Sequence, residues 1–236
     1  MPAYNEEEAV AVTAAQLLDA FGKAGITLEL IVVDNGSSDR TGDRVREIQP
    51  RYPGLMLHRV PVNEGYGAGI LAGFASATAA WVGHIPADGQ VDAEDVVRLF
   101  TSARATNGRV VAKVRRRFRL DGYLRKVVST AYNVFVLMLW PRLGSLDVNG
   151  APKMLRRDML ERMRLTSRQW FLDPELMIKA HYLGLRTLEL NVFARMRGTG
   201  LSHVKPVTCW EFFRELLAYR FGGALRQWKR EVAPVR

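Results

Sequence analysis

Two hydrophobic periodicities alternate along the first half of the chain. Apolar residues recur at helical spacing within residues 7–24, and the run LELIVVD that follows has the character of a buried strand. The succession continues with strands at LMLHRV and WVGHIP, and with helices over about 39–48, from the glycine loop to Ala80, and from about Asp92. This βαβ pattern predicts an α/β protein with a Rossmann-like, mostly parallel sheet flanked by helices.

The opening of the chain departs from this pattern. Folds of this kind usually begin with a strand, yet Pro2 to Asn5 has the composition of a loop that follows one. We therefore expect the first sheet position to be covered by another segment, or by residues that precede this sequence.

Polar clusters follow each of the three predicted strands, at 34–39, 63–69 and 88–90. Parallel α/β sheets bind ligands at the carboxyl ends of their strands, so these loops are expected to converge on one crevice. Asp34 ends a buried strand, and we predict that it contacts a nucleotide. Ser37, Ser38 and Asp39 are interpreted as the cap of the next helix.

The alternation stops after Val114. A basic run at 115–119, an apolar helix over 123–140, the stretch LDVNGAPKMLRR and helical patterns near 157–163 and 173–183 follow. No linker separates the halves, so the sequence predicts one domain with a nucleotide-binding half, 1–114, and a helical acceptor-side half, 115–236. The helix over 123–140 fits a buried core helix and a membrane-surface helix equally well.

The composition of the chain indicates which classes of partner and which cellular compartment to expect. The formal net charge of +10 indicates an anionic partner, and the absence of a nucleic-acid-binding signature argues against specific nucleic-acid recognition. Cys209 is the single cysteine, which excludes an intramolecular disulfide and fits a cytoplasmic setting. The most apolar stretch falls short of the ~20 residues that span a bilayer, so no transmembrane helix is expected.

Three further groups carry candidate chemistry. Asp88 and Gln90 stand two apart at a strand end, where two oxygens can bind one hard cation, although an ordinary turn before the helix explains them equally well. The cluster Asp147 to Lys153 suggests a polar loop entering a strand. In the segment 173–175, Asp-Pro-Glu suggests a helix start with capping Asp and Pro at the first helical position.

The order of these motifs resembles family 2 glycosyltransferases with the GT-A fold, most closely the dolichol-phosphate mannose synthase and polyprenyl-phosphate sugar transferase group. PAYNE at 2–6, VDNGSSD at 33–39 and NEGYG at 63–67 resemble its nucleotide-binding segments, and ADGQ at 87–90 the end of its metal motif. Pro86 replaces the first acid of that motif. The basic run from Arg115, the stretch from Asp147 to Lys153, and the late loop with Arg195 resemble the family's acceptor side.

The resemblance implies an inverting transfer from a GDP- or UDP-sugar, with GDP-mannose favoured, to a polyprenyl or dolichyl phosphate, with Mg²⁺ or Mn²⁺ as cofactor. It implies peripheral contact with the cytoplasmic membrane face, with a membrane subunit as a further partner. The implied donor-binding residues are Pro2, Ala3, Tyr4, Asn5, Glu6, Asp34, Asn63, Gly65, Gly67 and Asp88. The implied metal ligands are Asp88 and Gln90; the catalytic residues are Asp88, Arg115, Arg117 and Asp147; and the acceptor phosphate contacts are Arg115, Arg117, Lys153 and Arg195.

Two alternatives stay open. A glycosyltransferase acting on a hydroxyl or amine would need a general base, for which Asp147, Asp173 and Glu175 are the candidates. A non-catalytic nucleotide-binding subunit would account for Pro86 and for the unusual chain opening.

Overall fold

The computed structural model describes the backbone of residues 1–118, 123–145, 147–193 and 206–232, and all of their side chains except those of 116–118, 123–128 and 206–211. The strands form two sheets. The first has the parallel order β1 (Pro2–Ala3), β2 (Leu30–Asn35), β3 (Leu55–Val60). The second has the order β4 (Trp81–His84), β6 (Lys153–Arg156), β5 (Val110–Phe118), β7 (Arg186–Phe193), in which β6 runs antiparallel to both neighbours.

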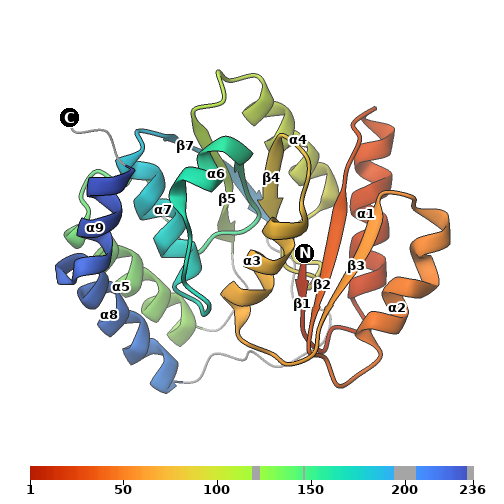
Figure 1. Cartoon of the computed structure of the whole chain (residues 1–236), viewed down its shortest axis with the longest axis horizontal. Helices are drawn as coiled ribbons and strands as arrows, with labels where there is room; N and C mark the ends of the chain where they lie inside the picture. The colour runs from red at the N-terminus through yellow and green to blue at the C-terminus, as the bar shows by residue number, and fades with distance from the viewer. Residues whose placement is uncertain (119–122, 146, 194–205, 233–236) are drawn as a thin grey trace.

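Helices surround the sheets. Figure 1 shows α1 (Val10–Lys23) and α2 (Thr41–Ile48) at one end of the molecule, and α5 (Tyr123–Leu139), α8 (Pro206–Phe221) and α9 (Gly223–Glu231) grouped at the other. The remaining helices are α3 (Tyr66–Ser76), α4 (Ala93–Arg104), α6 (Arg157–Met163) and α7 (Leu172–Tyr182), with a short 3-10 turn at Gln49–Arg51.

Two hydrophobic cores lie on opposite faces of the second sheet. Val110, Ala112 and Val114 of β5 pack into the core that contains α1 and α4, whereas Val111 packs into the core that contains α5 and α7. Successive side chains of a strand point to opposite faces, so this apolar run is buried on both sides. The fold is thus the predicted α/β arrangement with a mostly parallel sheet.

Several predicted boundaries need correction. The helix expected to reach Ala80 ends at Ser76, and Pro2–Ala3, expected as a loop, forms the short strand β1 beside β2. The strand pattern expected to stop at Val114 continues to Phe118, and β7 pairs with it in parallel. The acceptor-side half therefore contributes strands to the sheet as well as helices.

The apolar helix α5 is buried on one side only. Tyr132, Val136 and Trp140, at its end, are buried, and Tyr132 packs against Phe213 of α8. On the other side Met138 is 71% exposed. Among the residues that the structure describes, no helix combines the length and the apolar character needed to cross a membrane.

The start of α3 packs directly against the segment before α7. Ala68 N donates a hydrogen bond to Arg168 O at 2.8 Å, and a Cβ on Gly67 would lie 2.7 Å from Gln169 O. This backbone contact leaves no room for a side chain, so the glycine is required by close approach rather than by its dihedral angles.

Gly67→Ala should lower the free energy of unfolding by about 1–3 kcal/mol, because the added methyl overpacks two backbone segments. Urea denaturation measures the loss. Gly22→Ala in α1 is the matched control: its Cβ would meet no atom within 4 Å, and alanine should raise helix stability by up to ~1 kcal/mol. Equal effects of the two substitutions would contradict the packing described.

Candidate active site

The predicted site loops follow β1, β2, β3 and β4, at the carboxyl ends of these strands. Hydrogen bonds join the first two loops. Asn5 N donates to Ser37 Oγ at 3.1 Å, and Ser38 N donates to Asn5 Oδ1 at 2.9 Å. The prediction that Ser37 and Ser38 cap α2 is therefore wrong, because their hydroxyls bind the preceding loop. Only Asp39 binds the start of that helix, through Thr41 N.

Asp34 lies beneath this pair of loops and is 1% exposed. Its Oδ1 accepts a hydrogen bond from Ser37 N at 3.0 Å, while Oδ2 lies 3.4 Å from Arg59 Nε and accepts no hydrogen bond from the described residues. A Cβ on Gly42 would come within 2.7 Å of Oδ2, so α2 begins against the carboxylate. The site thus holds a fixed, buried negative charge at the end of β2.

Asn35 joins β2 to the glycine loop. Its Nδ2 donates to Asn63 Oδ1 at 3.2 Å and to Gly65 O at 2.9 Å. The next residue of the loop, Tyr66, stacks on Trp170 with ring centroids 4.6 Å apart. The glycine loop is therefore held from both sides, by the sheet and by the segment that precedes α7.

Asp88 and Gln90 flank Gly89, whose φ is +65°. Gln90 N donates to Asp88 Oδ1 at 3.2 Å, and the hydroxyl of Thr13 donates to Ala87 O at 3.1 Å, which anchors the loop on α1. Both side chains are half-buried.

Asp88 and Gln90 could bind a hard cation whose other ligands come from a bound molecule or from water. Asp88 and Gln90 offer a carboxylate and an amide oxygen, the donor types that Mg²⁺ accepts. The described residues contain no group of three or more His, Cys, Asp or Glu side chains placed for a metal. A cation at this loop would therefore draw its remaining ligands from a bound phosphate or from water, as Mg²⁺ commonly does.

A buried lysine holds the loop that contains Asp147. Lys113 of β5 donates to Asp147 O at 2.5 Å, to Val114 O at 3.2 Å and to Glu189 Oε1 at 3.2 Å. Burial lowers the pKa of Lys113 to about 8. Gly150 packs into the same corner, where its Cβ would meet Lys113 Nζ at 2.9 Å and Asp147 Oδ2 at 3.0 Å. The turn at 147–150 thus lies beside the middle of β5, next to the residue at which the basic run begins.

A second buried lysine joins the sheet to α7. Lys153 of β6 is fully buried and its Nζ binds the Asp173 carboxylate, whose Oδ1 also lies 3.2 Å from His84 Nε2. Burial alone would raise the pKa of Asp173, but Lys153 and His84 hold it below its ordinary value. Burial also lowers the pKa of His84. Lys153 therefore connects strand and helix and does not reach the surface, where an acceptor phosphate would approach.

The predicted helix start at 173–175 also differs in detail. Helix α7 begins at Leu172, so Pro174 is its third residue, and Asp173 forms an ion pair instead of a cap. Glu175 is fully buried and accepts hydrogen bonds from Ser167 N at 2.8 Å and Lys179 Nζ at 2.6 Å. Both carboxylates are occupied inside the fold.

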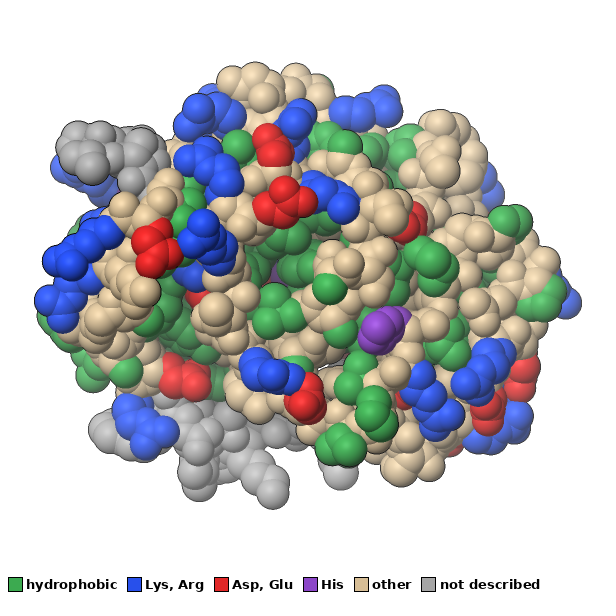
Figure 2. Space-filling model, in the orientation of Figure 1, with side chains coloured by type: hydrophobic (Ala, Val, Ile, Leu, Met, Phe, Trp, Pro, Cys, Tyr) green, Lys and Arg blue, Asp and Glu red, His purple; other side chains and the backbone are tan. Residues whose placement is uncertain are grey.

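Of the three arginines predicted to contact the acceptor phosphate, the structure describes the side chain of one. Arg115 is half-buried on β5, next to the turn at 147–150. Arg195 lies outside the described residues, and the side chain of Arg117 is likewise not described. On the face shown in Figure 2, basic side chains are distributed around the rim and do not form a single patch.

Sequence reasoning missed the residues that hold these loops. Lys113 and His84 both interrupt apolar strands, VVAKV and WVGHI, and a charged or titratable residue inside such a strand signals a buried polar contact. Asn35 had no comparable signal, because its partners lie 28 and 30 residues away.

Comparison with solved structures identifies this arrangement as the predicted GT-A fold. Glucosyl-3-phosphoglycerate synthase from Mycobacterium tuberculosis, solved with Mn²⁺, UDP and phosphoglyceric acid, superposes with a TM-score of 0.71 at 22% identity, over 93% of this chain and 76% of that one. At this identity the likeness concerns the fold alone.

The sequence model of Glycosyl transferase family 2 matches residues 1–164, and the chain belongs to that family. The undecaprenyl-phosphate 4-deoxy-4-formamido-L-arabinose transferase of Pectobacterium atrosepticum is 30% identical over 205 residues, which cover 86% of this chain and 60% of the relative. The dolichol-phosphate mannosyltransferase of Pyrococcus furiosus is 25% identical over 239 residues, covering 98% and 64%. The chain thus spans about three fifths of the length of these curated relatives.

Asp173→Asn should destabilise the fold by about 3–5 kcal/mol, because it leaves the buried Lys153 ammonium without its counter-charge. Replacing both partners, with Lys153→Met and Asp173→Leu together, should recover most of that loss, since no unpaired charge remains. Urea unfolding of the single and double variants measures both. A single variant as stable as the wild type, or a double variant no better than the single, would contradict a buried ion pair.

Proposed function

We propose that the protein is an inverting glycosyltransferase that moves a sugar from a nucleotide-sugar to a polyprenyl or dolichyl phosphate. The observation that carries the proposal is the grouping of Asp34, the glycine loop and the 88–90 loop at the carboxyl ends of successive strands, with the basic run in the second half of β5. The names of the two relatives, both of which act on lipid phosphates, support the same substrate class. We also propose that residues 1–114 bind the donor and 115–236 the acceptor.

The donor half combines contacts for a nucleoside and for a diphosphate. Asp34 would accept hydrogen bonds from the base or ribose, a usual role for a carboxylate at a strand end in such crevices. The loop at 2–6 and the glycine loop at 63–67 would enclose the donor, because their backbones are already fixed to β2 and α2. Asp88 and Gln90 would hold Mg²⁺ or Mn²⁺ against the diphosphate, and the bound cation would supply charge neutralisation at the leaving group.

The acceptor half favours a nucleophile that is already ionised. A phosphate monoester has a second pKa near ~6, so it attacks without a general base. Asp173 and Glu175, two of the three candidate bases, are occupied in buried ion pairs. Arg115, together with Arg117 and Arg195, would orient the phosphate so that its oxygen bonds to the anomeric carbon as the bond to the diphosphate oxygen breaks, which inverts the configuration. Asp147 would shape this side of the site through the turn held by Lys113.

Contact with a membrane surface is part of the proposal. Helices α5 and α8 lie side by side, since Arg220 Nε donates to Leu139 O at 3.2 Å. Each exposes apolar residues one turn apart, Val134 and Met138 on α5 and Leu217 and Phe221 on α8. Exposed apolar side chains next to arginine suit the interface of an anionic bilayer, where a lipid-linked acceptor would be presented. We propose that the protein acts at the cytoplasmic face of the membrane, with a membrane subunit as a further partner.

The most specific part of the proposal is the identity of the nucleotide-sugar donor. GDP-mannose follows from the resemblance of the sequence motifs, and the Pyrococcus relative is named for mannosyl transfer. Two solved structures with this fold contain UDP and UDP-glucose, respectively. GDP-mannose and UDP-glucose are therefore the first two donors to compare.

Release of nucleoside diphosphate from these two donors, with Mg²⁺ or Mn²⁺ and a short polyprenyl phosphate, tests the proposal. Turnover should require both the cation and the lipid phosphate. Asp88→Ala should reduce it by at least ~100-fold, because it removes the carboxylate that would hold the cation at the leaving group.

Asp43→Ala is the matched control, since this carboxylate lies on the exposed surface of α2, where it forms an ion pair with Arg46. It should leave the rate unchanged. Turnover on an alcohol acceptor but not on the lipid phosphate would replace the proposed acceptor. Nucleotide binding without turnover on either acceptor would indicate the non-catalytic alternative.

A further inference from the structure

Residues 164–170 form a strap between α6 and α7 that lies against the glycine loop. Ala68 N donates a hydrogen bond to Arg168 O at 2.8 Å, and Gln169 Nε2 donates to Glu64 O at 3.1 Å. The Arg168 guanidinium also pairs with the Glu64 carboxylate. The strap therefore connects the half of the chain proposed to bind the acceptor directly to a loop of the half proposed to bind the donor.

The bond to Ala68 is one that helix α3 cannot make by itself. Ala68 is the third residue of that helix, and the first four amides of a helix have no partner within it. Gly65, which precedes the helix, has no side chain that could accept a hydrogen bond from them. The strap carbonyl thus does what a capping side chain does elsewhere, and it fixes the junction between the glycine loop and α3.

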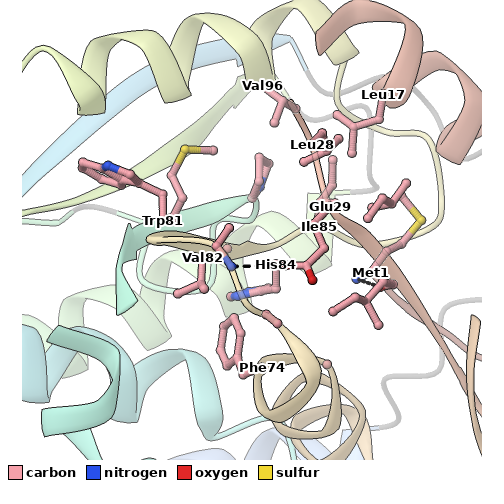
Figure 3. A pocket seen from close by; sticks show the side chains of 18 of the residues that line it. Met1, Leu17, Leu28, Glu29, Phe74, Trp81, Val82, His84, Ile85 and Val96 are labelled. Atoms are coloured by element: carbon pink, nitrogen blue, oxygen red, sulfur yellow. Dashed lines mark hydrogen bonds between the residues drawn. The ribbon is translucent and has the colours of Figure 1, made fainter. Parts of the chain in front are cut away.

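The rest of α3 is held without the strap. Phe74, in its last turn, lies edge-on to His84 of β4 with ring centroids 6.1 Å apart, and Ile70 is 2% exposed. Figure 3 shows Phe74 and His84 next to each other at one side of a cavity. Movement of the strap would therefore affect the first turn of α3 and the glycine loop, and would leave the later turns in place.

Glu175 of α7 holds the strap in place. Its Oε2 accepts hydrogen bonds from Thr166 N at 3.1 Å and from Ser167 N at 2.8 Å. The Glu175 side chain is fully buried, whereas Thr166 is exposed and Ser167 is half-buried. Because water is available to the two amides, loss of the carboxylate would release the strap to solvent and would not break the fold.

Lys179 holds the strap at a second point. Its Nζ lies 2.6 Å from Glu175 Oε1 and donates to Arg164 O at 2.9 Å. The same Nζ lies 5.4 Å from the ring centroid of Trp228 in α9. Two buried side chains one turn apart on α7 thus set the position of the strap.

A buried charge pair needs a reason beyond stability, because apolar residues of similar size would stabilise a core as well or better. Here both oxygens of Glu175 are bonded, Oε1 to Lys179 and Oε2 to the strap amides, and the side chain is closed to solvent. Glu175 therefore cannot reach a substrate as a general base. What the pair does in this structure is to place the strap, and with it the glycine loop.

We propose that Glu175 is a positioning residue for the nucleotide-sugar, which acts through the strap by holding the glycine loop in the position that encloses the donor. The inference rests on the proposed function, since it takes the glycine loop to contact the donor. It assigns a role in donor binding to a residue of the acceptor-side half. Loosening the strap should weaken donor binding and leave the transfer step almost unchanged, because Glu175 does not touch the reacting atoms.

Two double variants of the full chain separate the strap contact from the ion pair. Glu175→Gln with Lys179→Met keeps an oxygen that can accept from the strap amides, and is called the acceptor-retaining form. Glu175→Leu with Lys179→Met removes that oxygen, and is called the acceptor-free form. Both lack the two charges, so a difference between them reports on the strap contact. The acceptor-free form should be at least as stable to urea as the other, because it buries no amide.

Hydrogen exchange of the Ala68 amide tests the structural step. Exchange should be at least about tenfold faster in the acceptor-free form, because release of the strap withdraws the carbonyl that Ala68 binds. Ala72, in the middle of α3, is the control and should exchange equally in both forms. Equal exchange at Ala68 would overturn the inference.

Nucleotide binding tests the functional step. With Mn²⁺ present, the dissociation constant of GDP or UDP, whichever the wild type binds better, should be at least about tenfold higher in the acceptor-free form than in the acceptor-retaining form. The KM for the donor should rise in parallel, while kcat should differ by less than about twofold. A general base at this position would instead lower kcat in both forms and leave KM unchanged.

Ser167→Pro gives a second route to the same result. It removes one strap amide and leaves the α7 pair intact, so it should weaken nucleotide binding even if a double variant does not fold. Nucleotide binding equal to that of the wild type in these variants would overturn the inference and leave the proposed function standing. A wild-type chain that binds neither nucleotide would overturn both, so the two failures can be told apart.

Discussion

The ion pair between Lys153 and Asp173 is the interaction on which the relative positions of the second sheet and α7 depend. It connects β6, the one antiparallel strand among those described, to helix α7, and His84 of β4 contacts the same carboxylate. A buried lysine without such a partner would be strongly destabilising, so the positions of the strand and helix are coupled. Lys113 plays a comparable role on β5, where it holds both the turn at 147–150 and Glu189 of β7.

The loops at the candidate site are held in place in two different ways. The loops after β1, β2 and β3 are joined to each other mainly through backbone groups and short side chains, as between Asn5 and Ser38 or Asn35 and Gly65. The turn at 147–150 is held through the long, buried side chain of Lys113. Asp34 remains a fixed negative charge below the first set, while Arg115 begins the basic run beside the second. Separation of acidic and basic groups in this way suits a donor held through a cation and an acceptor that carries phosphate.

Much of the sheet could be predicted from the sequence, because β2 is a buried, largely apolar run and both β2 and β3 are followed by turn residues. Strand β7 was missed since most of its residues are only partly buried, which weakens the alternation that identifies a strand. The site loops could be placed because the ends of parallel strands meet at one edge. Their connections could not, since Asn35 and Lys113 act on residues distant in sequence.

Paramagnetic broadening by Mn²⁺ tests most directly whether these loops form one nucleotide crevice. Backbone amide resonances would be recorded with a nucleoside diphosphate, before and after substoichiometric Mn²⁺ is added. If the loops form one crevice, broadening is strongest at Asp88 to Gln90, weaker at Gly65 and Ser37, and absent in α9. Broadening centred on the exposed acids of α2, with the 88–90 loop unaffected, would contradict it.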